Sequence, residues 1–401
     1  MIVKNETPVL GRLFASVKDI IDYCVIADTG SADGTPEFIA REMERYNIPG
    51  TVLHHDWVNY GHNRNLALQH VYKKKWPGWV LFIDADEELA CDDPAVFSEL
   101  EPGITYRMQK HHDNLRYSLP NLVDVSRTRW QWQGVVHEYL EHVGGRVKYQ
   151  ALESARIIYH AGEGVRSRGV SDAEKYLADA ALLEKECRRN PDDARSRFYL
   201  AQSYADAGRP KQALEQYLIR ARMPGWAEEN FVAQLRAARL TERLQRPAEE
   251  IIRAFRKAHA MRPTRAEALH DLAAYYRKQE QYEQAYTAAK QAAALPLPDD
   301  TLFVEQDIYN WRILNEIGVA GYWTGRYIEA RDACAAILER NEQGEIKLAA
   351  ATVQRIQDNL RFSQDRIAEQ QVRMDGTGYS ELLLGAGSRT RTYLQRGRPP
   401  T

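Results

Sequence analysis

Short apolar runs and helical patterns alternate along the chain up to about Gly164. Each apolar run ends in polar or turn-forming residues, which predicts short strands, and the segments between the runs have the apolar spacing of helices. Strands that alternate with helices indicate a mostly parallel sheet covered on both faces, and such a sheet binds ligands at the carboxyl ends of its strands. The predicted strands are 1–3, 23–27, 51–54 and 79–83, and the predicted helices are 10–21, 36–46, with Thr35 as its cap, and 63–72.

From about Ser171 the pattern changes to one helix after another. Four passages align to a single template of two antiparallel helices, with small residues where the helices approach and aromatic residues between the pairs. This template resembles the tetratricopeptide repeat, and a plain helical bundle is the alternative. The spacing before the last passage is too long for a regular array, so residues 294–300 are expected to carry an insertion. The four passages are 197–224, 235–263, 269–296 and 314–341.

A chain of 401 residues exceeds what one compact core usually supports, so two domains are expected. The predicted bounds are 1–170 for the first domain, 171–345 for the helical repeats, and 346–401 for a terminal helix and a mobile tail. Hydrophobic content of 44% and charged content of 27% are ordinary for a soluble protein. The net charge of −2 gives no global basic field to hold a polyanion.

Cysteine usage and the apolar runs predict a cytoplasmic protein. The four cysteines lie far apart without a CxxC pair, which argues against a zinc knot or a disulfide framework and is typical of a reducing compartment. Lys4, Asn5 and Glu6 interrupt the first apolar run, so no signal peptide is expected. No apolar run approaches the roughly 18 residues that a membrane helix needs, so no membrane insertion is expected.

The strand predicted at 79–83 runs directly into the acidic sequence DADEE, at Asp84, Asp86, Glu87 and Glu88. Carboxylates this close to one another resist joint ionisation unless a cation lies between them. Carboxylate oxygens suit Mg²⁺ and Mn²⁺, which favour phosphate oxygens as their remaining ligands. The D-x-D pattern is therefore a candidate site for a metal and a diphosphate, and solvated acidic residues at a strand end are the alternative.

Three stretches in this order, MIVKNE at 1–6, VIADTGSADGT at 25–35 and DADE at 84–87, resemble the family-2 glycosyltransferases. The likeness is greatest to bacterial proteins in which a nucleotide-sugar transferase domain is joined to tetratricopeptide repeats. The resemblance implies an α/β domain of GT-A type followed by an all-α, tetratricopeptide-like repeat domain. It also implies a nucleotide-diphosphate sugar donor, with a UDP-sugar expected first, a Mn²⁺ or Mg²⁺ ion, and usually inversion at the anomeric carbon.

The resemblance also assigns residues to the donor. Asn5 and Glu6 are expected to bond the nucleotide base, with helix capping as their alternative role, and Asp28 is expected to accept a hydrogen bond from the base. Asp86 is the predicted direct metal ligand, and His160 is predicted to complete the metal site. The remaining donor-binding candidates are Arg64 at a helix start, Asp84 at the ribose or at a metal-bound water, and Arg166 and Arg168 in a Gly-Arg segment that closes over the diphosphate.

The stretch WQWQGVVHEYL, residues 130–140, is the candidate acceptor region, because aromatic faces make platforms for sugar rings. An inverting transferase needs a general base that deprotonates the acceptor. Glu138 stands where the family usually keeps such an acid, so it is the predicted base, and His137 is the second candidate. A packed Trp cluster with a surface His-Glu pair is the structural alternative.

The sequence therefore predicts a metal-dependent, inverting hexosyltransferase that acts on a protein, peptide or saccharide acceptor. Modified DNA bases are a third class of acceptor, which the near-neutral charge makes less favoured. The repeats are expected to present a concave surface for an extended peptide or to support homo-oligomers. A repeat scaffold whose transferase domain has decayed is the rival from another class. A nucleotidyltransferase would need a Gly-rich basic loop near the N-terminus, and MIVKNETP is not one.

Overall fold

The computed structural model describes residues 1–112, 115–143 and 147–375. The chain divides into two compact units, Met1–Ala213 and Leu214–Thr401. The first unit contains the α/β region together with the first helices of the helical region. The domain bounds inferred from the sequence stay predictions, and the tail predicted to be mobile, 376–401, lies outside the described residues.

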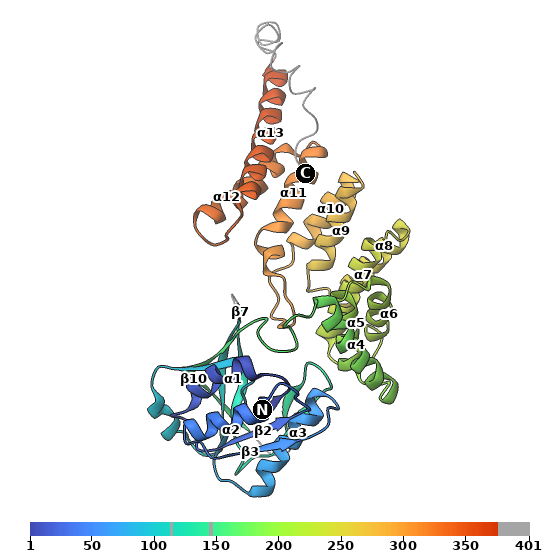
Figure 1. Ribbon diagram of the computed structural model, residues 1–401. Helices are drawn as coiled ribbons and strands as arrows, with labels where there is room; N and C mark the ends of the chain where they lie inside the picture. The colour runs from blue at the N-terminus through green and yellow to red at the C-terminus, as the bar shows by residue number, and fades with distance from the viewer. Residues whose placement is uncertain (113–114, 144–146, 376–401) are drawn as a thin grey trace. The chain divides into compact units, whose positions relative to one another are not determined.

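A three-stranded parallel sheet opens the first unit (Figure 1). Its order is β1-β2-β3, so each strand lies beside the next one along the chain. The helix predicted at 36–46 begins one residue earlier, and its N-cap is Gly34 at φ +83° rather than Thr35, because the chain reverses there in a left-handed conformation that glycine adopts freely. The elements are β1 (Ile2–Val3), α1 (Thr7–Val17), β2 (Cys24–Asp28), α2 (Thr35–Arg45) and β3 (Gly50–His54).

A second, five-stranded sheet has the order β4-β7-β6-β10-β5, and one pair in it, β6 with β10, is parallel. The expectation of a mostly parallel sheet is therefore wrong beyond β3. The physical reason is that β6 returns directly into β7 as a long hairpin, and a short connection can join antiparallel strands alone. The elements are α3 (Tyr60–Lys74), β4 (Trp79–Leu81), β5 (Glu87–Cys91), a 3₁₀ helix (Pro94–Ser98), β6 (Ile104–His112), β7 (Leu115–Asp124) and β10 (Lys148–Tyr159), with a separate hairpin of β8 (Trp130–Gln133) and β9 (Tyr139–His142).

One hydrophobic core joins the two sheets. Leu10, Leu13 and Phe14 of α1 are almost fully buried in it, together with Ile26 of the first sheet and Met108 of the second. Burial of this apolar surface is the main stabilising term of the region. The acidic turn that follows β4 is thus carried by a rigid packed body rather than by a free loop.

Helices follow one another from Ser171, as the sequence predicts. Ser171 begins α4 with a capping box, in which its hydroxyl and the Glu174 carboxylate each bond the other's backbone N–H. The four repeat passages correspond to α5/α6, α7/α8, α9/α10 and α11/α12, and the connection expected to hold an insertion follows α10. The bounds are α4 (Asp172–Arg189), α5 (Ala194–Asp206), α6 (Pro210–Arg220), α7 (Ala227–Arg243), α8 (Ala248–Met261), α9 (Glu267–Lys278), α10 (Tyr282–Ala293), a π-helical turn (Ile308–Arg312), α11 (Ile313–Trp323), α12 (Tyr327–Glu342) and α13 (Ala350–Asp375).

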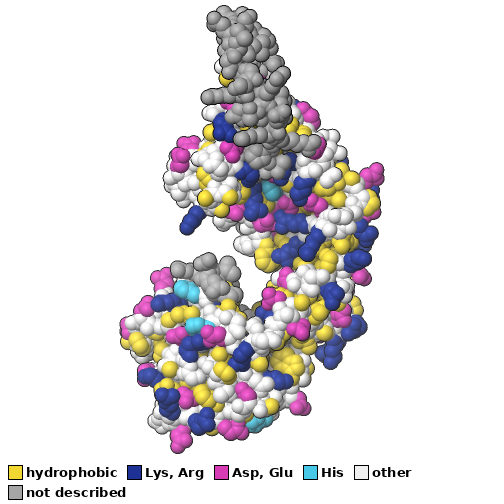
Figure 2. All heavy atoms as spheres, turned by 45° about the horizontal axis from the view of Figure 1, so that its top comes forward, with side chains coloured by type: hydrophobic (Ala, Val, Ile, Leu, Met, Phe, Trp, Pro, Cys, Tyr) yellow, Lys and Arg dark blue, Asp and Glu magenta, His cyan; other side chains and the backbone are white. Residues whose placement is uncertain are grey.

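The predicted fold class, an α/β region followed by an all-helical repeat region, is confirmed. Among the helices that the structure describes, none combines the length and the apolar character needed to cross a membrane. Lys and Arg side chains are interspersed with Asp and Glu on the face shown in Figure 2, and neither sign of charge dominates that face.

Candidate active site

The DADE sequence forms the turn between β4 and β5. The backbone N–H of Asp84 donates to Glu87 Oε2 at 2.8 Å, and Glu87, which is 1% exposed, also pairs with Lys110 of β6. Burial and the neighbouring Asp84 raise the pKa of Glu87, whereas Lys110 opposes the shift. Glu87 therefore stabilises the turn from within, whereas Asp84 and Asp86 are left for contacts with other groups.

Arg64 of α3 joins the D-x-D turn to the predicted base. Its Nη1 and Nη2 donate to Asp84 Oδ1 and Oδ2 at 2.7 and 2.9 Å, and its Nε donates to Glu138 Oε1 at 2.8 Å. The guanidinium also lies over the Trp132 ring, 4.9 Å from the centroid. Burial disfavours the charged forms of Arg64 and Asp84, but their mutual attraction outweighs it: the pKa of Arg64 is raised and that of Asp84 is lowered. Three predicted site residues are thus brought together by one fork of hydrogen bonds.

Helix α3 reaches Arg64 in its second turn, not its first. The side chain of Asn59 caps the helix by accepting from the His62 N–H at 2.8 Å, so the helix begins at Tyr60. The expectation that Arg64 stands among free amides at a helix start is therefore wrong. Asn65 exchanges two 2.8 Å hydrogen bonds with the backbone of Trp132, which fixes β8 against α3. A Cβ on Gly61 would lie 2.2 Å from the Gly134 carbonyl oxygen, so this close approach requires glycine.

Asp86, the predicted metal ligand, has no Lys, Arg or His ion-pair partner among the residues that the structure describes. Burial and the charge of Asp84 raise its pKa. Gly164 packs against it so closely that a Cβ there would lie 2.5 Å from Asp86 Oδ2. A cation that binds beside such a carboxylate would stabilise its charged form.

His160 stands at the end of β10, next to the acidic turn. Its backbone N–H donates to the Asp86 carbonyl oxygen at 3.1 Å, whereas its ring Nε2 lies 3.0 Å from Glu88 Oε2. Within 1–112, 115–143 and 147–375, no group of three His, Cys, Asp or Glu side chains is arranged to hold a metal ion. The His160 ring therefore pairs with Glu88 in this structure, and the metal-binding roles of Asp86 and His160 stay predictions.

The N-terminal turn fastens the loop that follows β2. Asn5, at φ +54°, accepts the Ala32 N–H on its side-chain oxygen, and its own N–H donates to Ser31, each at 2.8 Å. Asp28 is 4% exposed and accepts the N–H groups of Gly30 and Ser31 at 3.1 Å. Both residues therefore hold their own loop in this structure, and their predicted contacts with a nucleotide base stay predictions.

Hydrogen bonds to the N-terminal turn fix the Gly-Arg segment at Val165 and at Arg168. Glu6 accepts the Val165 N–H at 3.1 Å, and Arg168 donates to the Asn5 carbonyl oxygen at 2.8 Å. Burial raises the pKa of Glu6 to about 7, with Asp86 adding to the shift. Arg166 forms an ion pair with Asp179 of α4 and lies over the Tyr60 ring. The predicted phosphate role of Arg166 would require it to leave or share Asp179.

Residues from α5 hold the turn that carries Glu138. His137 has φ +52°, a backbone conformation that residues other than glycine seldom adopt. Its ring stacks on Tyr199, with 4.2 Å between the ring centroids. Arg195 donates to the His137 carbonyl oxygen at 3.5 Å and lies over the Tyr139 and Tyr199 rings. Desolvation, followed by the charges of Arg166, Arg195 and Lys175, lowers the pKa of His137 to about 4. That value leaves the ring neutral at neutral pH, and the choice of Glu138 or His137 as the base stays a prediction.

Comparison with known proteins assigns the first part of this architecture. Residues 1–95 match the family model "Glycosyl transferase family 2". The matched residues include the N-terminal turn, Asp28, Arg64 and the D-x-D turn. The resemblance inferred from the sequence is confirmed, and the match supports a glycosyltransferase.

Curated relatives reflect both regions. A TPR repeat-containing protein of Synechococcus elongatus is 27% identical over 322 residues, which span 73% of this chain and 74% of that protein. An uncharacterized glycosyltransferase of Rickettsia felis is 30% identical over 125 residues, which span 31% of this chain and 38% of that protein. The chain thus covers little more than a third of the length of the rickettsial relative.

Two solved structures are similar to part of the chain. A crystal structure of the MamA protein covers 43% of this chain and 87% of its own, with 19% identity and a TM-score of 0.35. BtubC from P. vanneervenii covers 57% and 93%, with 14% identity and a TM-score of 0.38.

Sequence reasoning missed the groups that come from outside the motifs. The Arg64 bridge, the stacking of Tyr199 on His137 and the pairing of Asp179 with Arg166 all join residues of different structural elements. One local signal was available: Asn59 precedes an apolar helical pattern and marks the true start of α3.

Proposed function

We propose that this protein is a metal-dependent, inverting glycosyltransferase that moves a sugar from a nucleotide-diphosphate donor, a UDP-sugar first among them, to a protein, peptide or saccharide acceptor. The observation that carries the proposal is the half-buried Asp86 carboxylate, which forms no ion pair with a described Lys, Arg or His and lies beside a second carboxylate, Asp84, that does. A structural carboxylate would be paired, as Asp84 and Glu87 are.

The donor set fits Mn²⁺ or Mg²⁺ bound together with a substrate. These ions take one or two protein carboxylates and complete their shell with phosphate oxygens and water. Asp86 would hold the ion, with His160 as a second ligand once its ring leaves Glu88. When bound, the ion would offset the charge that develops on the leaving nucleotide diphosphate.

The other polar residues would contribute by holding reacting groups in place. Arg64 keeps Asp84 and Glu138 in fixed orientations by three charge-assisted hydrogen bonds, which limits the reorganisation needed at the moment of reaction. Glu138 would accept the acceptor's hydroxyl or amide proton as that group attacks the anomeric carbon. The Gly-Arg segment, fastened to Glu6 and Asn5, would cover the diphosphate.

Donor hydrolysis tests this proposal without knowledge of the acceptor. A panel of nucleotide sugars is incubated with the purified chain and Mn²⁺, and the released nucleotide is measured. One nucleotide class is expected to be hydrolysed and to raise the melting temperature in the presence of the ion. The change Asp86→Asn is expected to lower hydrolysis on the order of a thousandfold, because the ion's electrostatic contribution is several kcal/mol.

The matched control is Asp19→Asn, because Asp19 is an exposed carboxylate, paired with Lys18, outside the site. It is expected to leave hydrolysis and melting temperature unchanged. Equal activity of Asp86→Asn and Asp19→Asn would contradict the role of Asp86. Absence of binding and hydrolysis with every donor would favour the repeat-scaffold alternative.

A further inference from the structure

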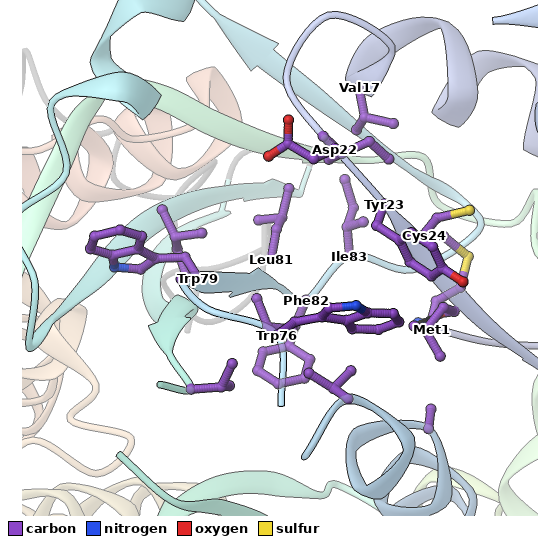
Figure 3. A pocket seen from close by; sticks show the side chains of 18 of the residues that line it. Met1, Val17, Asp22, Tyr23, Cys24, Trp76, Trp79, Leu81, Phe82 and Ile83 are labelled. Atoms are coloured by element: carbon purple, nitrogen blue, oxygen red, sulfur yellow. Dashed lines mark hydrogen bonds between the residues drawn. The ribbon is translucent and has the colours of Figure 1, made fainter. Parts of the chain in front are cut away.

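A large cavity in the first unit, about 720 Å³ in volume, is lined mainly by apolar side chains, of which Figure 3 shows Trp76 and Leu81. Asp86 is not among the described residues that line it. Arg64 is the only Lys or Arg among those lining residues, and each of its three nitrogens already donates to a carboxylate. The charged part of a donor is therefore expected to bind outside this cavity.

Arg12 of α1 is a cation whose hydrogen-bonding groups are only partly used. Its Nη1 lies 2.7 Å from Glu163 Oε2. Its Nε and Nη2 are buried and have no hydrogen-bond partner among the residues that the structure describes. A buried N–H group without an acceptor costs free energy, so these two nitrogens call for an acceptor that comes from a ligand. Together they form one edge of the guanidinium plane, which matches two oxygens of one phosphate group.

The unused edge of Arg12 belongs to the surroundings of the acidic turn. Arg12 lies close enough to Asp86 that its positive charge opposes the rise that burial causes in the pKa of that carboxyl. Its partner Glu163 directly precedes Gly164, the residue that packs against Asp86 Oδ2. A cation with unused donors and a carboxylate without an ion pair among the described residues therefore lie near each other. A metal-bound diphosphate presents a metal ion to the carboxylate and phosphate oxygens to the guanidinium.

Glu163 holds the position of an oxyanion on Arg12. Its side chain is 45% exposed, and an ion pair at this exposure contributes little to stability. A phosphate group carries more charge and can meet two N–H groups at once, so it is the stronger partner for the guanidinium. Replacement of Glu163 by phosphate would release the segment from α1, whereas the hydrogen bonds of the same segment to the N-terminal turn would stay.

We propose that Arg12 binds the diphosphate of the nucleotide-sugar donor through Nε and Nη2, and that Glu163 is the internal anion that the diphosphate displaces. The inference rests on the proposed function, because it identifies the anion as the donor's diphosphate. In the unliganded chain the ion pair fastens the segment that carries Gly164 to α1. When the donor binds, its phosphate oxygens pair with the guanidinium and the Glu163 carboxylate turns to solvent. The two residues therefore have opposite effects on affinity for the diphosphate.

Calorimetric titration with inorganic pyrophosphate in excess Mg²⁺ measures this affinity without knowledge of the sugar or the base. The variants are Arg12→Gln, Glu163→Gln and the double variant. Arg12→Gln is expected to bind pyrophosphate about 10- to 100-fold more weakly, because two charge-assisted hydrogen bonds are lost. Glu163→Gln is expected to bind it about 2- to 5-fold more tightly, because the competing charge is removed. Arg156→Gln, in an ion pair with Asp92 outside the site, is the matched control and should leave the affinity unchanged.

The double variant is expected to bind as weakly as Arg12→Gln, because Glu163 acts through the guanidinium. Weaker binding in both single variants would overturn the proposal, since the loss of a structural ion pair loosens the same segment in each. Absence of pyrophosphate binding by the unaltered chain would overturn it as well. Should Arg12→Gln fail to fold, as its melting curve would show, the sign of the change in Glu163→Gln decides.

Failure of the proposed function would give a different result. Pyrophosphate affinities that follow the expected signs, without hydrolysis of any nucleotide sugar, would contradict the transferase and keep Arg12 as an anion ligand. Hydrolysis of a nucleotide sugar, with equal pyrophosphate affinity in the unaltered chain and every variant, would keep the transferase and overturn the role of Arg12.

Discussion

Buried charges occur in both compact units, but they are satisfied differently. In the second unit Arg265 is fully buried and donates to Glu267 at 2.6–3.0 Å and to Asp300 at 3.2 Å. Tyr309 donates to the same Glu267 at 2.8 Å. In the first unit Asp86 lies near two other carboxyl groups, Asp84 and Glu6, and its pKa is raised.

Whether a buried charge is fully paired distinguishes structural carboxylates from candidate functional ones. A buried ion pair with all its hydrogen bonds made holds a fold together, and losing one partner leaves an uncompensated charge. A carboxylate that the chain does not compensate costs free energy in the unliganded state, which is recovered when a cation binds. The predictions below test whether the paired network is structural and whether the acidic turn and its supports are catalytic.

The largest effect on stability is expected from Arg265→Ala. The substitution leaves Glu267 buried without its cation, which costs about 3–5 kcal/mol of unfolding free energy. Urea unfolding followed by fluorescence measures the change. Arg331→Ala, in the exposed pair with Asp332, is the control and should cost less than ~1 kcal/mol. Similar losses of unfolding free energy in both variants would contradict a structural role for the buried network.

The next effect is a loss of turnover in Arg64→Lys. A lysine keeps the positive charge but cannot make the fork to Asp84 together with the bond to Glu138. Donor hydrolysis, as kcat/KM, is expected to fall about 10- to 100-fold, or ~1.4–2.8 kcal/mol of transition-state stabilisation. Arg45→Lys, at the exposed end of α2, serves as the control. Unchanged kcat/KM would show that charge alone suffices.

A smaller loss is expected when the support from α5 is removed. Tyr199→Ala deletes the ring on which His137 stacks, which loosens the strained turn before Glu138. Transfer or hydrolysis is expected to fall ~10-fold in kcat, with little change in donor KM. Tyr199→Phe keeps the ring and should retain activity. A loss in KM alone would place Tyr199 in donor binding instead.

The smallest effect is a difference in pH dependence. The pKa of Glu6 is raised by burial to about 7 in the folded chain, above its usual value of 4.5. Its protonated form therefore stabilises the fold below pH ~4.5, and this contribution is lost as the pH rises through about 7. The melting temperature of Glu6→Gln should decline less between pH 5 and pH 8 than that of the unaltered chain. A steeper decline in Glu6→Gln would reverse the assigned sign.

The sequence predicts the parts of the fold that depend on local periodicity. The strand at β2 and the helix pairs of the repeats appear where apolar spacing places them. The long β6/β7 hairpin was missed, because its strands mix charged and apolar residues and include Pro120, which weakens a strand pattern. Pairing of β4 with β7 rather than with β1 is decided by distant residues, and local patterns carry no information about it.

The candidate site shows the same division. The motif that supplies Asp84 and Asp86 is visible as carboxylates after an apolar run. Asp84 is ion-paired with Arg64, whereas Asp86 has no ion pair among the described residues. This difference depends on the packing of α3 against β8. The contributions of Asp179 and Tyr199 are not visible either, because the sequence alone places them inside an ordinary helical repeat.

One guanidinium serves both Asp84 and Glu138, and this shared support has an evolutionary consequence. A lineage that replaces either acid leaves the other with a differently held partner, so the three positions are expected to vary together rather than one at a time. Related chains that keep arginine at position 64 should keep both acids. Chains that have lost this arginine should also have other residues in place of the two acids.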